Sequence, residues 1–312
     1  MRVIRCVRRM RALESGCTLT IGNFDGLHLG HQAIVEQVRE RARALGVPSV
    51  LMSFEPMPRE FFSPENAPAR LSSPREKMRM AQSLGVDIFA WARFDAAFAG
   101  LSPHAFLDEL IAARLNAHYV LVGEDFRFGQ KRAGDIETLR AFAHDRDIEI
   151  APLPDVQVDG ARVSSTRVRD ALAAGEVAHA KRLLGHAYWV SGRVVAGKRL
   201  GRTLGFPTAN IRLARKPAPR YGVYAVWVYM ADGVRRAGAA SFGVRPTVNG
   251  REPLLEVFVL DFEGDLYGQR IDVSFEAFIR AEERYDSLDA LTAQMHRDVA
   301  SVRSHLQEPE ST

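Results

Sequence analysis

The chain has 312 residues, 46% of them hydrophobic and 26% charged, which is enough apolar material for about two domain cores. Its formal net charge of +4 is spread along the chain without a nucleic-acid-binding motif, and nucleotide substrates explain such a mild excess equally well. No run of about 18 apolar residues predicts a membrane span, and the two cysteines and nine histidines form no CxxC or zinc motif. We therefore expect a cytoplasmic chain that binds neither a membrane nor nucleic acid.

The first half of the sequence alternates strand and helix patterns. Four short apolar runs are typical of buried strands, at residues 18–21, 50–54, 88–94 and 119–122. A helical pattern follows residue 31, and Ser73, Ser102 and Asp135 each open a further helix as capping residues. The alternation predicts a parallel sheet with helices on both faces, in which ligands bind beyond the carboxyl ends of the strands.

The second half has a different rhythm that begins near His186. Short strands separated by glycine-rich turns are expected at residues 188–195, 207–211, 223–229, 236–242, 254–260 and 271–275. One helical pattern, from residue 287 to residue 302, closes the chain. This half predicts a small antiparallel β-barrel with a C-terminal helix, and we expect domains of 1–186 and 187–312.

The segment from Gly22 to His31 is the most informative part of the chain. It joins the first strand to the first helix, with the spacing Gly-x-x-x-Gly-x-His-x-Gly-His. Helix first-turn N–H groups have no intrahelical partner, and the helix dipole favours an anion there. His28 and His31 could both point at one phosphate and stabilise the charge that develops at phosphorus. The alternative is a tight turn with two surface histidines.

This segment resembles the H-x-G-H motif of the nucleotidyltransferases, which attack the α-phosphate of ATP and release pyrophosphate. Two later segments, Val122–Gly129 (VGEDFRFG) and Val163–Arg169 (VSSTRVR), look like further signatures of bacterial FMN adenylyltransferases. Gly192–Gly197 (GRVVAG) and Gly201–Asn210 (GRTLGFPTAN) look like the riboflavin kinase signature. In this order the motifs are similar to those of the bifunctional riboflavin kinase/FMN adenylyltransferase family, over residues 18–305.

The resemblance implies an α/β nucleotidyltransferase domain with a Rossmann-like parallel sheet, followed by a barrel-shaped riboflavin kinase domain. It implies that ATP phosphorylates riboflavin to FMN and that a second ATP adenylylates FMN to FAD, releasing pyrophosphate. The expected small-molecule partners are riboflavin, FMN, FAD and ATP, and the expected cofactor is Mg²⁺. No oligomeric state is predicted.

The adenylylation site implied by the resemblance has His28 and His31 as its catalytic residues. Its nucleotide-binding residues are Gly22, Asn23, Phe24, Gly30, Arg162, Ser165, Thr166 and Arg169. Read without the resemblance, the Ser-Ser-Thr run supplies helix-capping hydroxyls, and the arginines beside it supply phosphate-binding guanidinium groups. A plain helix cap is the alternative for this run.

The resemblance also implies which residues bind the flavin. They lie in two segments that are rich in apolar residues. They are Pro56, Pro58, Phe62, Asp125 and Phe128. Flat apolar walls with a few polar groups suit an isoalloxazine ring. The alternative is core packing, and it fits Phe126 best among the neighbouring aromatic residues.

Residues 192–199 nearly match the P-loop pattern G-x-x-x-x-G-K-[ST]. Arg199 replaces the magnesium-binding hydroxyl, and no long helix follows, so we reject a P-loop. We expect instead a glycine-rich flap over the ATP phosphates, formed by Gly197, Gly201 and Gly205, of which Gly197 and Gly201 are expected to bind the nucleotide.

The kinase chemistry is expected from two strands. Alternation places Thr208 and Asn210 on one face, where their oxygens could bind Mg²⁺; a polar edge strand is the alternative. Glu256 points away from Leu255, and the resemblance makes it the base that accepts the proton of the ribityl hydroxyl. A solvated strand glutamate is the alternative there.

Two positions depart from the family pattern. Ser241 begins a Ser-Phe-Gly segment where the family commonly has Asn-Ile-Gly, and Phe258 takes the place of a histidine. Two other functions were weighed: a single-activity nucleotidyltransferase whose barrel only binds or regulates, and a flavin- or RNA-binding module without activity. The intact Glu256 disfavours the first, and the two histidines of the H-x-G-H segment disfavour the second.

Overall fold

The computed structural model describes residues 1–197, 200–213, 218–247 and 250–306. The chain forms two compact units, of which the first comprises 1–68 and 72–163 and the second 69–71 and 164–312. Helices α7 (Ser165–Ala174) and α8 (Val177–Leu184) therefore belong to the second unit, in which α8 packs on barrel strands. The expected domain boundary at residue 186 stays a prediction, and it differs from the division into compact units by these two helices.

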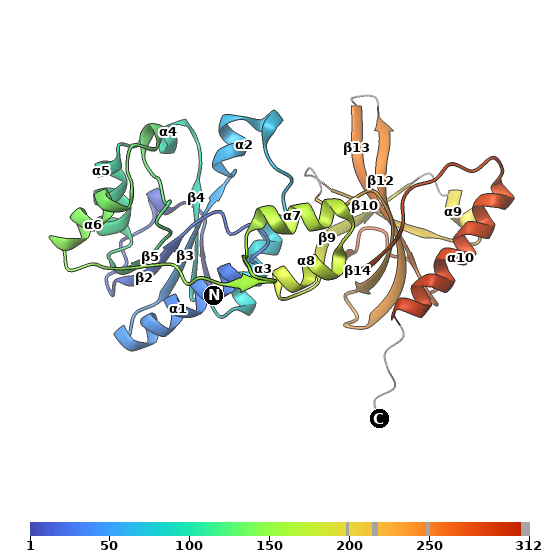
Figure 1. Cartoon of the computed structure of the whole chain (residues 1–312), viewed down its shortest axis with the longest axis horizontal. Coiled ribbons are helices and arrows are strands. Elements are labelled where there is room, and N and C mark those ends of the chain that lie inside the picture. Colours follow the sequence, from blue (N-terminus) through green and yellow to red (C-terminus); the bar gives the residue numbers. More distant parts are fainter. Residues whose placement is uncertain (198–199, 214–217, 248–249, 307–312) are drawn as a thin grey trace. The chain divides into compact units, whose positions relative to one another are not determined.

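The first unit contains the predicted parallel sheet (Figure 1). Its six strands follow the order β1-β4-β3-β2-β5-β6, and every pairing is parallel. The strands are β1 (Arg2–Ile4), β2 (Cys17–Ile21), β3 (Ser49–Glu55), β4 (Ile88–Arg93), β5 (Ala117–Leu121) and β6 (Glu149–Ala151). The sequence did not predict β1 and β6, since three residues at a sheet edge are too few to show a hydrophobic period.

The helices of the first unit begin where capping residues place them. Ser73 accepts the N–H of Glu76, and the side chains of Ser102 and Asp135 accept backbone N–H groups at the starts of their helices. All three predicted caps are confirmed. The α-helices are α1 (Leu29–Leu45), α2 (Pro58–Phe62), α3 (Pro74–Ser83), α4 (Ala96–Ala99), α5 (Pro103–Ala105) and α6 (Ile136–His144). The remaining elements of this unit are η1 (Val7–Arg9), η2 (Pro64–Asn66), the π-helix η3 (Phe106–Arg114), η4 (Gln130–Arg132) and the hairpin of β7 (Gln157–Val158) and β8 (Ala161–Arg162).

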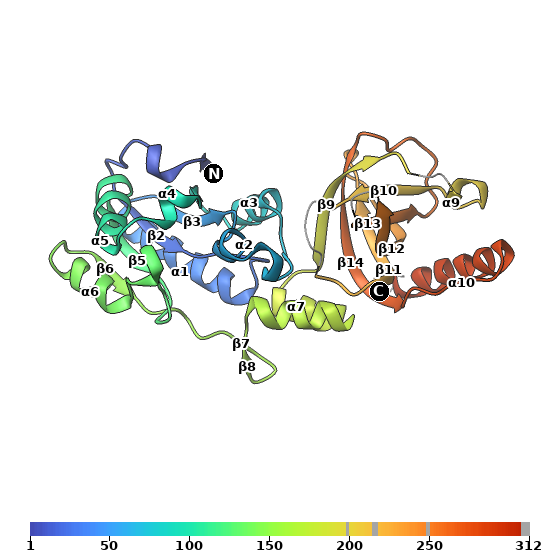
Figure 2. The same cartoon turned by 90° about the horizontal axis from the view of Figure 1, so that it is seen from above.

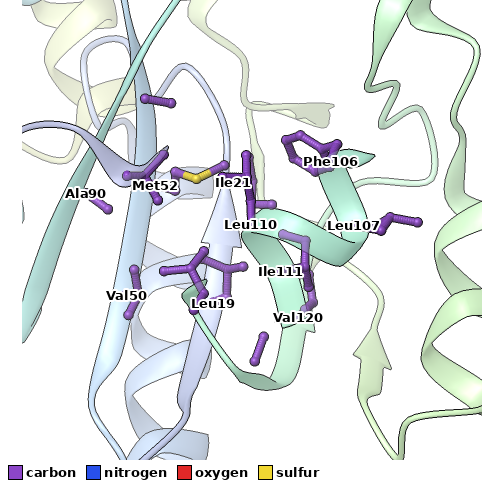
Figure 3. Close-up of a cluster of buried hydrophobic side chains, with 14 of the residues drawn as sticks. Leu19, Ile21, Val50, Met52, Ala90, Phe106, Leu107, Leu110, Ile111 and Val120 are labelled. Atoms are coloured by element: carbon purple, nitrogen blue, oxygen red, sulfur yellow. The ribbon is translucent and has the colours of Figure 1, made fainter. Parts of the chain in front are cut away.

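The sheet of the first unit is buried on both faces, as its continuous apolar runs require. On one face Leu19, Val50 and Val120 pack against η3, as Figure 3 shows. On the other face Leu51 and Phe89 pack against α1 and α3. Because successive strand residues point to opposite faces, each strand contributes to both layers.

The second unit is built on a closed antiparallel barrel with the strand order β10-β13-β12-β11-β14-β9 (Figure 2). Its strands are β9 (Tyr188–Val195), β10 (Thr208–Arg212), β11 (Gly222–Tyr229), β12 (Arg235–Thr247), β13 (Gly250–Val259) and β14 (Arg270–Arg280). The short helix α9 (Leu200–Thr203) precedes β10, and α10 (Leu288–Leu306) packs Val302 and Leu306 on the outside of the barrel. The predicted barrel and C-terminal helix are confirmed, with β12 and β14 longer than expected.

Candidate active sites

The loop between β2 and α1 has an unusual backbone. Phe24, Gly26 and Leu27 have φ angles of 46°, 83° and 43°. The left-handed region disfavours bulky side chains, and such a conformation persists when the surroundings hold it. Here both bulky side chains are buried in the core, with Phe24 2% and Leu27 0% exposed. Core packing thus fixes the path of the loop that carries the H-x-G-H motif.

The two histidines of the motif lie together at the start of α1. His28 is the N-cap residue, and its Nδ1 accepts the N–H of His31 at 3.4 Å. The ring proton of a neutral His28 is therefore on Nε2, which makes Nε2 a donor. The two rings stack with centroids 3.7 Å apart, and His28 is 5% exposed. The surface-turn alternative is therefore wrong for His28.

Two glycines of the motif allow these rings to pack. A Cβ at Gly30 would lie 3.2 Å from Cε1 of His28, and a Cβ at Gly22 would lie 3.2 Å from Cε2 of Phe24. The Phe24 ring meets His31 edge to face at 5.1 Å. A side chain at either glycine would thus crowd an aromatic ring of the loop, so the two glycines favour this close packing.

The loops that follow β3, β2 and β5 share one end of the sheet, because these three parallel strands are neighbours. The loop after β3 carries Pro56, with Pro58 as the first residue of α2, and the segment after β5 carries the exposed Asp125. A Cβ at Gly123 would lie 2.5 Å from the Asp125 carboxylate, which folds back over this glycine. The predicted flavin-side residues therefore come from the same sheet end as the histidines.

The predicted aromatic flavin residues differ in exposure. Phe62 is 67% exposed and contacts Phe94 at 5.7 Å between ring centroids. Phe128 is only 6% exposed and packs between Phe106 and Phe126. The core-packing alternative assigned to Phe126 therefore describes Phe128 better, since Phe126 is half-buried.

The Ser-Ser-Thr segment caps α7 as expected. Ser164 is the N-cap residue and accepts the N–H of Arg167 at 3.3 Å. Ser165 and Thr166 follow in the first turn, and Arg169 donates Nε–H to the Ala69 carbonyl at 2.6 Å. These helix residues lie in the second compact unit, whereas Arg162 lies on β8 of the first. Their part in nucleotide binding stays a prediction.

The second unit contains a cavity of about 430 Å³ between barrel strands and α10. The predicted kinase residues Thr208, Asn210 and Glu256 all line it. The strand register explains this, because Glu256 lies opposite Asn210 on β10 and opposite Ser241 on β12. Leu255 is fully buried, so alternation along β13 turns Glu256 to the cavity. The expected side-chain directions of this strand are confirmed.

A smaller cavity of about 70 Å³ shares the wall formed by Thr208 and Asn210. Gly197 lines it, and a Cβ at Gly197 would lie 2.5 Å from the Asn210 amide nitrogen. A Cβ at Gly201 would lie 2.3 Å from the carbonyl oxygen of Phe206. Both predicted flap glycines therefore occur where a neighbouring group leaves no room for a side chain. Lys198 and Arg199 of the rejected P-loop pattern lie outside the described residues, and β9 runs through residue 195 as expected.

The wall that the two cavities share contains two oxygen-bearing side chains, those of Thr208 and Asn210. The Asn210 amide nitrogen donates to the Thr208 carbonyl at 3.3 Å, which orients the amide. Within the described ranges, no group of three or more His, Cys, Asp or Glu side chains could hold a metal. A hydroxyl and an amide oxygen opposite a carboxylate nevertheless fit Mg²⁺, which keeps several waters and takes ligands from substrate phosphates.

The residues that join α10 to the barrel were not predicted from the sequence. The Arg280 guanidinium donates two hydrogen bonds to the Asp298 carboxylate, at 2.8 and 2.7 Å, and both residues line the larger cavity. Asp298 is 5% exposed, and its hydrogen bond raises the pKa of Arg280 above its ordinary value. The only local signal was one acidic residue among the apolar positions of the last helix.

The departures from the family pattern also have places in the larger cavity. Phe258 lies opposite Thr208 and packs edge to face on Phe206 at 5.2 Å, and Phe206 contacts His296 of α10 at 5.0 Å. Ser241 lies beside Glu256 in the register. Phe258 therefore adds to an apolar wall, and Ser241 places a small hydroxyl next to the carboxylate.

A parallel α/β unit with a histidine-capped helix after a glycine-containing loop, joined to a barrel whose cavity is lined by a carboxylate, a hydroxyl and an amide, is the arrangement expected of an enzyme with two phosphate-transfer sites. The family model for FAD synthetase matches residues 10–167, and the one for riboflavin kinase matches residues 184–306. The chain belongs to the bifunctional riboflavin kinase/FMN adenylyltransferase family.

Relatives of that name match nearly the whole chain. The one from Pseudomonas fluorescens is 45% identical over 305 residues, covering 97% of both chains. The one from Escherichia coli strain K12 is 44% identical over 304 residues, with the same coverage. A crystal structure described as a macrolide-efflux protein from Streptococcus pneumoniae is 32% identical, with a TM-score of 0.84 over 96% of this chain and 98% of its own. No helix in the described part of this chain is long and apolar enough to span a membrane.

Proposed function

We propose that the second unit phosphorylates riboflavin to FMN and that the first unit adenylylates FMN to FAD, each with one ATP. The observation that carries this proposal is the separation of two kinds of site. A helix start with stacked histidines lies in one unit, and a carboxylate beside oxygen donors lines a cavity in the other. The first suits attack by an ionised phosphate, and the second suits attack by a hydroxyl group.

In the kinase reaction, Glu256 accepts the proton of the riboflavin 5′-hydroxyl as that oxygen attacks the γ-phosphate of ATP. Thr208 and Asn210 would hold Mg²⁺, which neutralises phosphate charge when it is bound. The cavity volume of about 430 Å³ lies in the range of small-molecule sites. Phe258 and Met295 line the same cavity as Glu256 and would supply apolar surface for the flavin ring.

In the adenylyl transfer, the phosphate of FMN is already ionised and attacks the α-phosphate of ATP without a base. The Nε2–H of His28, the start of α1 and the loop N–H groups stabilise the charge on the transferring phosphate. Pro56, Pro58, Phe62, Asp125 and Phe128 are the flavin-side residues of this proposal. The nucleotide roles of Arg162, Ser165, Thr166 and Arg169 rest on the family resemblance.

Product analysis of the full chain tests the function. With riboflavin, ATP and MgCl₂, chromatography should show FMN first and FAD later. Addition of EDTA should stop FMN formation, because the proposed metal ligands then hold no cation. A folded chain that makes no FMN from riboflavin, or no FAD from supplied FMN, contradicts the corresponding half of the proposal.

We also propose that the two activities separate on two fragments. A fragment of 187–312 should make FMN and no FAD, and a fragment of 1–186 should retain weak adenylyl transfer. Removing α8 takes away the buried Leu183 and Leu184, uncovers the surface of β9 and β14 on which α8 packs, and breaks the ion pair between Lys181 and Glu276. A fragment of 164–312 is therefore the matched control and should be the more stable kinase. A folded 164–312 fragment that makes no FMN contradicts an autonomous kinase unit.

A cytoplasmic location is part of the proposal. Cys6 and Cys17 are both free thiols, which suits a reducing compartment. Riboflavin, FMN, FAD and ATP are the expected small-molecule partners there.

A further inference from the structure

A buried lysine lies beneath the histidine loop of the first unit. Lys77, on the first turns of α3, is 0% exposed. A buried ammonium group is costly unless hydrogen bonds and neighbouring dipoles compensate for lost hydration. The contacts of Lys77 therefore show which part of the fold requires the charge.

The Lys77 ammonium is hydrogen-bonded to Asn23, the residue that follows Gly22 in the loop. Its Nζ donates to the carbonyl oxygen of Asn23 at 2.6 Å and to Oγ of Ser53 at 3.1 Å. The Ser53 hydroxyl donates to the same Asn23 carbonyl at 3.1 Å. The Trp91 ring lies 5.6 Å from the ammonium, within cation–π range. Three elements, α3, β3 and the loop, thus meet at one carbonyl group.

The start of α3 holds the loop at a second point. The Asp25 carboxylate accepts hydrogen bonds from the N–H of Ser72 at 2.9 Å and from its hydroxyl at 3.1 Å. The N–H of Gly26 donates to Oγ of Ser72 at 3.1 Å. The capping box of Ser73 and Glu76 fixes the helix start from which Ser72 and Lys77 reach the loop.

The bond to the Asn23 carbonyl also sets the direction of the next N–H group. In a planar trans peptide the carbonyl of one residue and the N–H of the next point in opposite directions. The carbonyl of Asn23 points toward the buried ammonium, so the N–H of Phe24 points away from it. Phe24 then turns into the left-handed region, and the chain proceeds to the N-cap residue His28.

We propose that Lys77 is a positioning residue for adenylyl transfer. It locks the Asn23–Phe24 peptide so that the N–H of Phe24 faces the phosphates of bound ATP, and Ser53 supports the same lock. The buried positive charge adds to the potential of the helix start below the transferring phosphate. This role rests on the proposed function of the first unit.

The test replaces the charge with an apolar chain of similar length, as Lys77→Met in the full-length chain. The value of kcat/KM for ATP in FMN adenylylation should fall about 30-fold, since a misaligned phosphate donor weakens transition-state binding. The KM for FMN and the rate of riboflavin phosphorylation should stay within about twofold of wild type. Lys131→Met is the matched control, because Lys131 is exposed and lies in the same unit as Lys77.

Ser53→Ala is the second variant, and thermal unfolding of all variants accompanies the kinetics. Normal adenylylation by a folded Lys77→Met chain overturns the proposal. If Lys77→Met instead unfolds the first unit, Ser53→Ala decides: slower transfer at an unchanged melting temperature supports the proposal, and unchanged transfer overturns it. A wild-type chain that makes no FAD from FMN shows that the proposed function itself is wrong, which separates the two failures.

Discussion

The candidate site residues of the two units are distributed differently along the sequence. In the first unit, the loop backbone and two stacked histidines lie within the ten residues from Gly22 to His31. In the second unit, Asn210, Ser241 and Glu256 come from three strands and meet only through the barrel register. In the proposed function, a contiguous motif and a dispersed set of side chains thus have related tasks.

The difference follows from the nucleophile that each site must use. An FMN phosphate arrives ionised, so donors and a positive potential are the catalytic groups that the first site needs. A ribityl hydroxyl must lose a proton as it attacks, so the second site needs an acceptor such as Glu256. Helix starts supply donors locally, whereas a carboxylate beside a metal site requires strands brought together by the fold.

The largest effect is expected for Glu256→Gln, which keeps the shape of the side chain and removes its base. The kinase rate should fall by about 10²–10⁴-fold. FAD formation from supplied FMN should not change, because the first site does not use this residue. Initial rates of both reactions on the same preparation measure the effect. Equal loss of both activities would show that the variant unfolds the chain or that the roles are misassigned.

The reciprocal variant is His28→Ala. Loss of a donor to the transferring phosphate should slow FAD formation by about 10²–10³-fold, while FMN accumulates from riboflavin. His31→Ala should have the same direction, and the double variant should abolish the activity. His144→Ala is the control, because this histidine is exposed in the same unit. A normal FAD yield from the double variant would contradict the catalytic role of the two histidines.

A smaller effect is expected where α10 meets the barrel. Asp298→Asn removes the charge that pairs with Arg280 in the wall of the larger cavity. The KM for riboflavin should rise about tenfold with a smaller change in kcat, because the pair positions the helix and does not touch the reacting atoms. Asp289→Asn, an exposed change on the same helix, should have no effect. An unchanged KM for riboflavin in Asp298→Asn argues that the pair is not part of the flavin site.

The last prediction concerns how the stability of the first unit depends on pH. Burial raises the pKa of the Cys17 thiol from its ordinary value to about 12. Between about pH 9 and pH 12 the unfolded chain loses this proton and the folded chain keeps it, so the free energy of unfolding falls by at most about 1.4 kcal/mol per pH unit. Urea unfolding at several alkaline pH values should show a shallower decline for Cys17→Ala than for the wild type. If stability declines equally steeply with pH in Cys17→Ala and in the wild type, the buried thiol is not the cause of the decline.

Local sequence predicted those features that local interactions determine. The caps at Ser73 and Asp135, the strand β9 and the side-chain directions at Leu255 and Glu256 were all predicted within a few residues. Each depends on hydrogen bonds or alternation within a short segment. The motif around His28 was visible for the same reason, because its residues lie within one short segment between β2 and α1.

The features that were missed depend on partners far along the chain. Lys77 is a polar residue on a helix, and its acceptor Asn23 lies 54 positions away. The pair of Arg280 and Asp298 joins a strand to a helix, and neither residue stands out in its own segment. The π-helix η3 was expected as an ordinary helix, since its apolar face has the same buried residues. Tertiary contacts decided the first two of these cases.

The closed register of the barrel has a consequence for how such enzymes diverge. β13 has a paired neighbour on each side, so one extra residue before Glu256 would turn Leu255 to the cavity and the carboxylate to the interior. Over long descent, insertions should therefore collect in the hairpins, and the lengths of these strands should change more slowly than their residues.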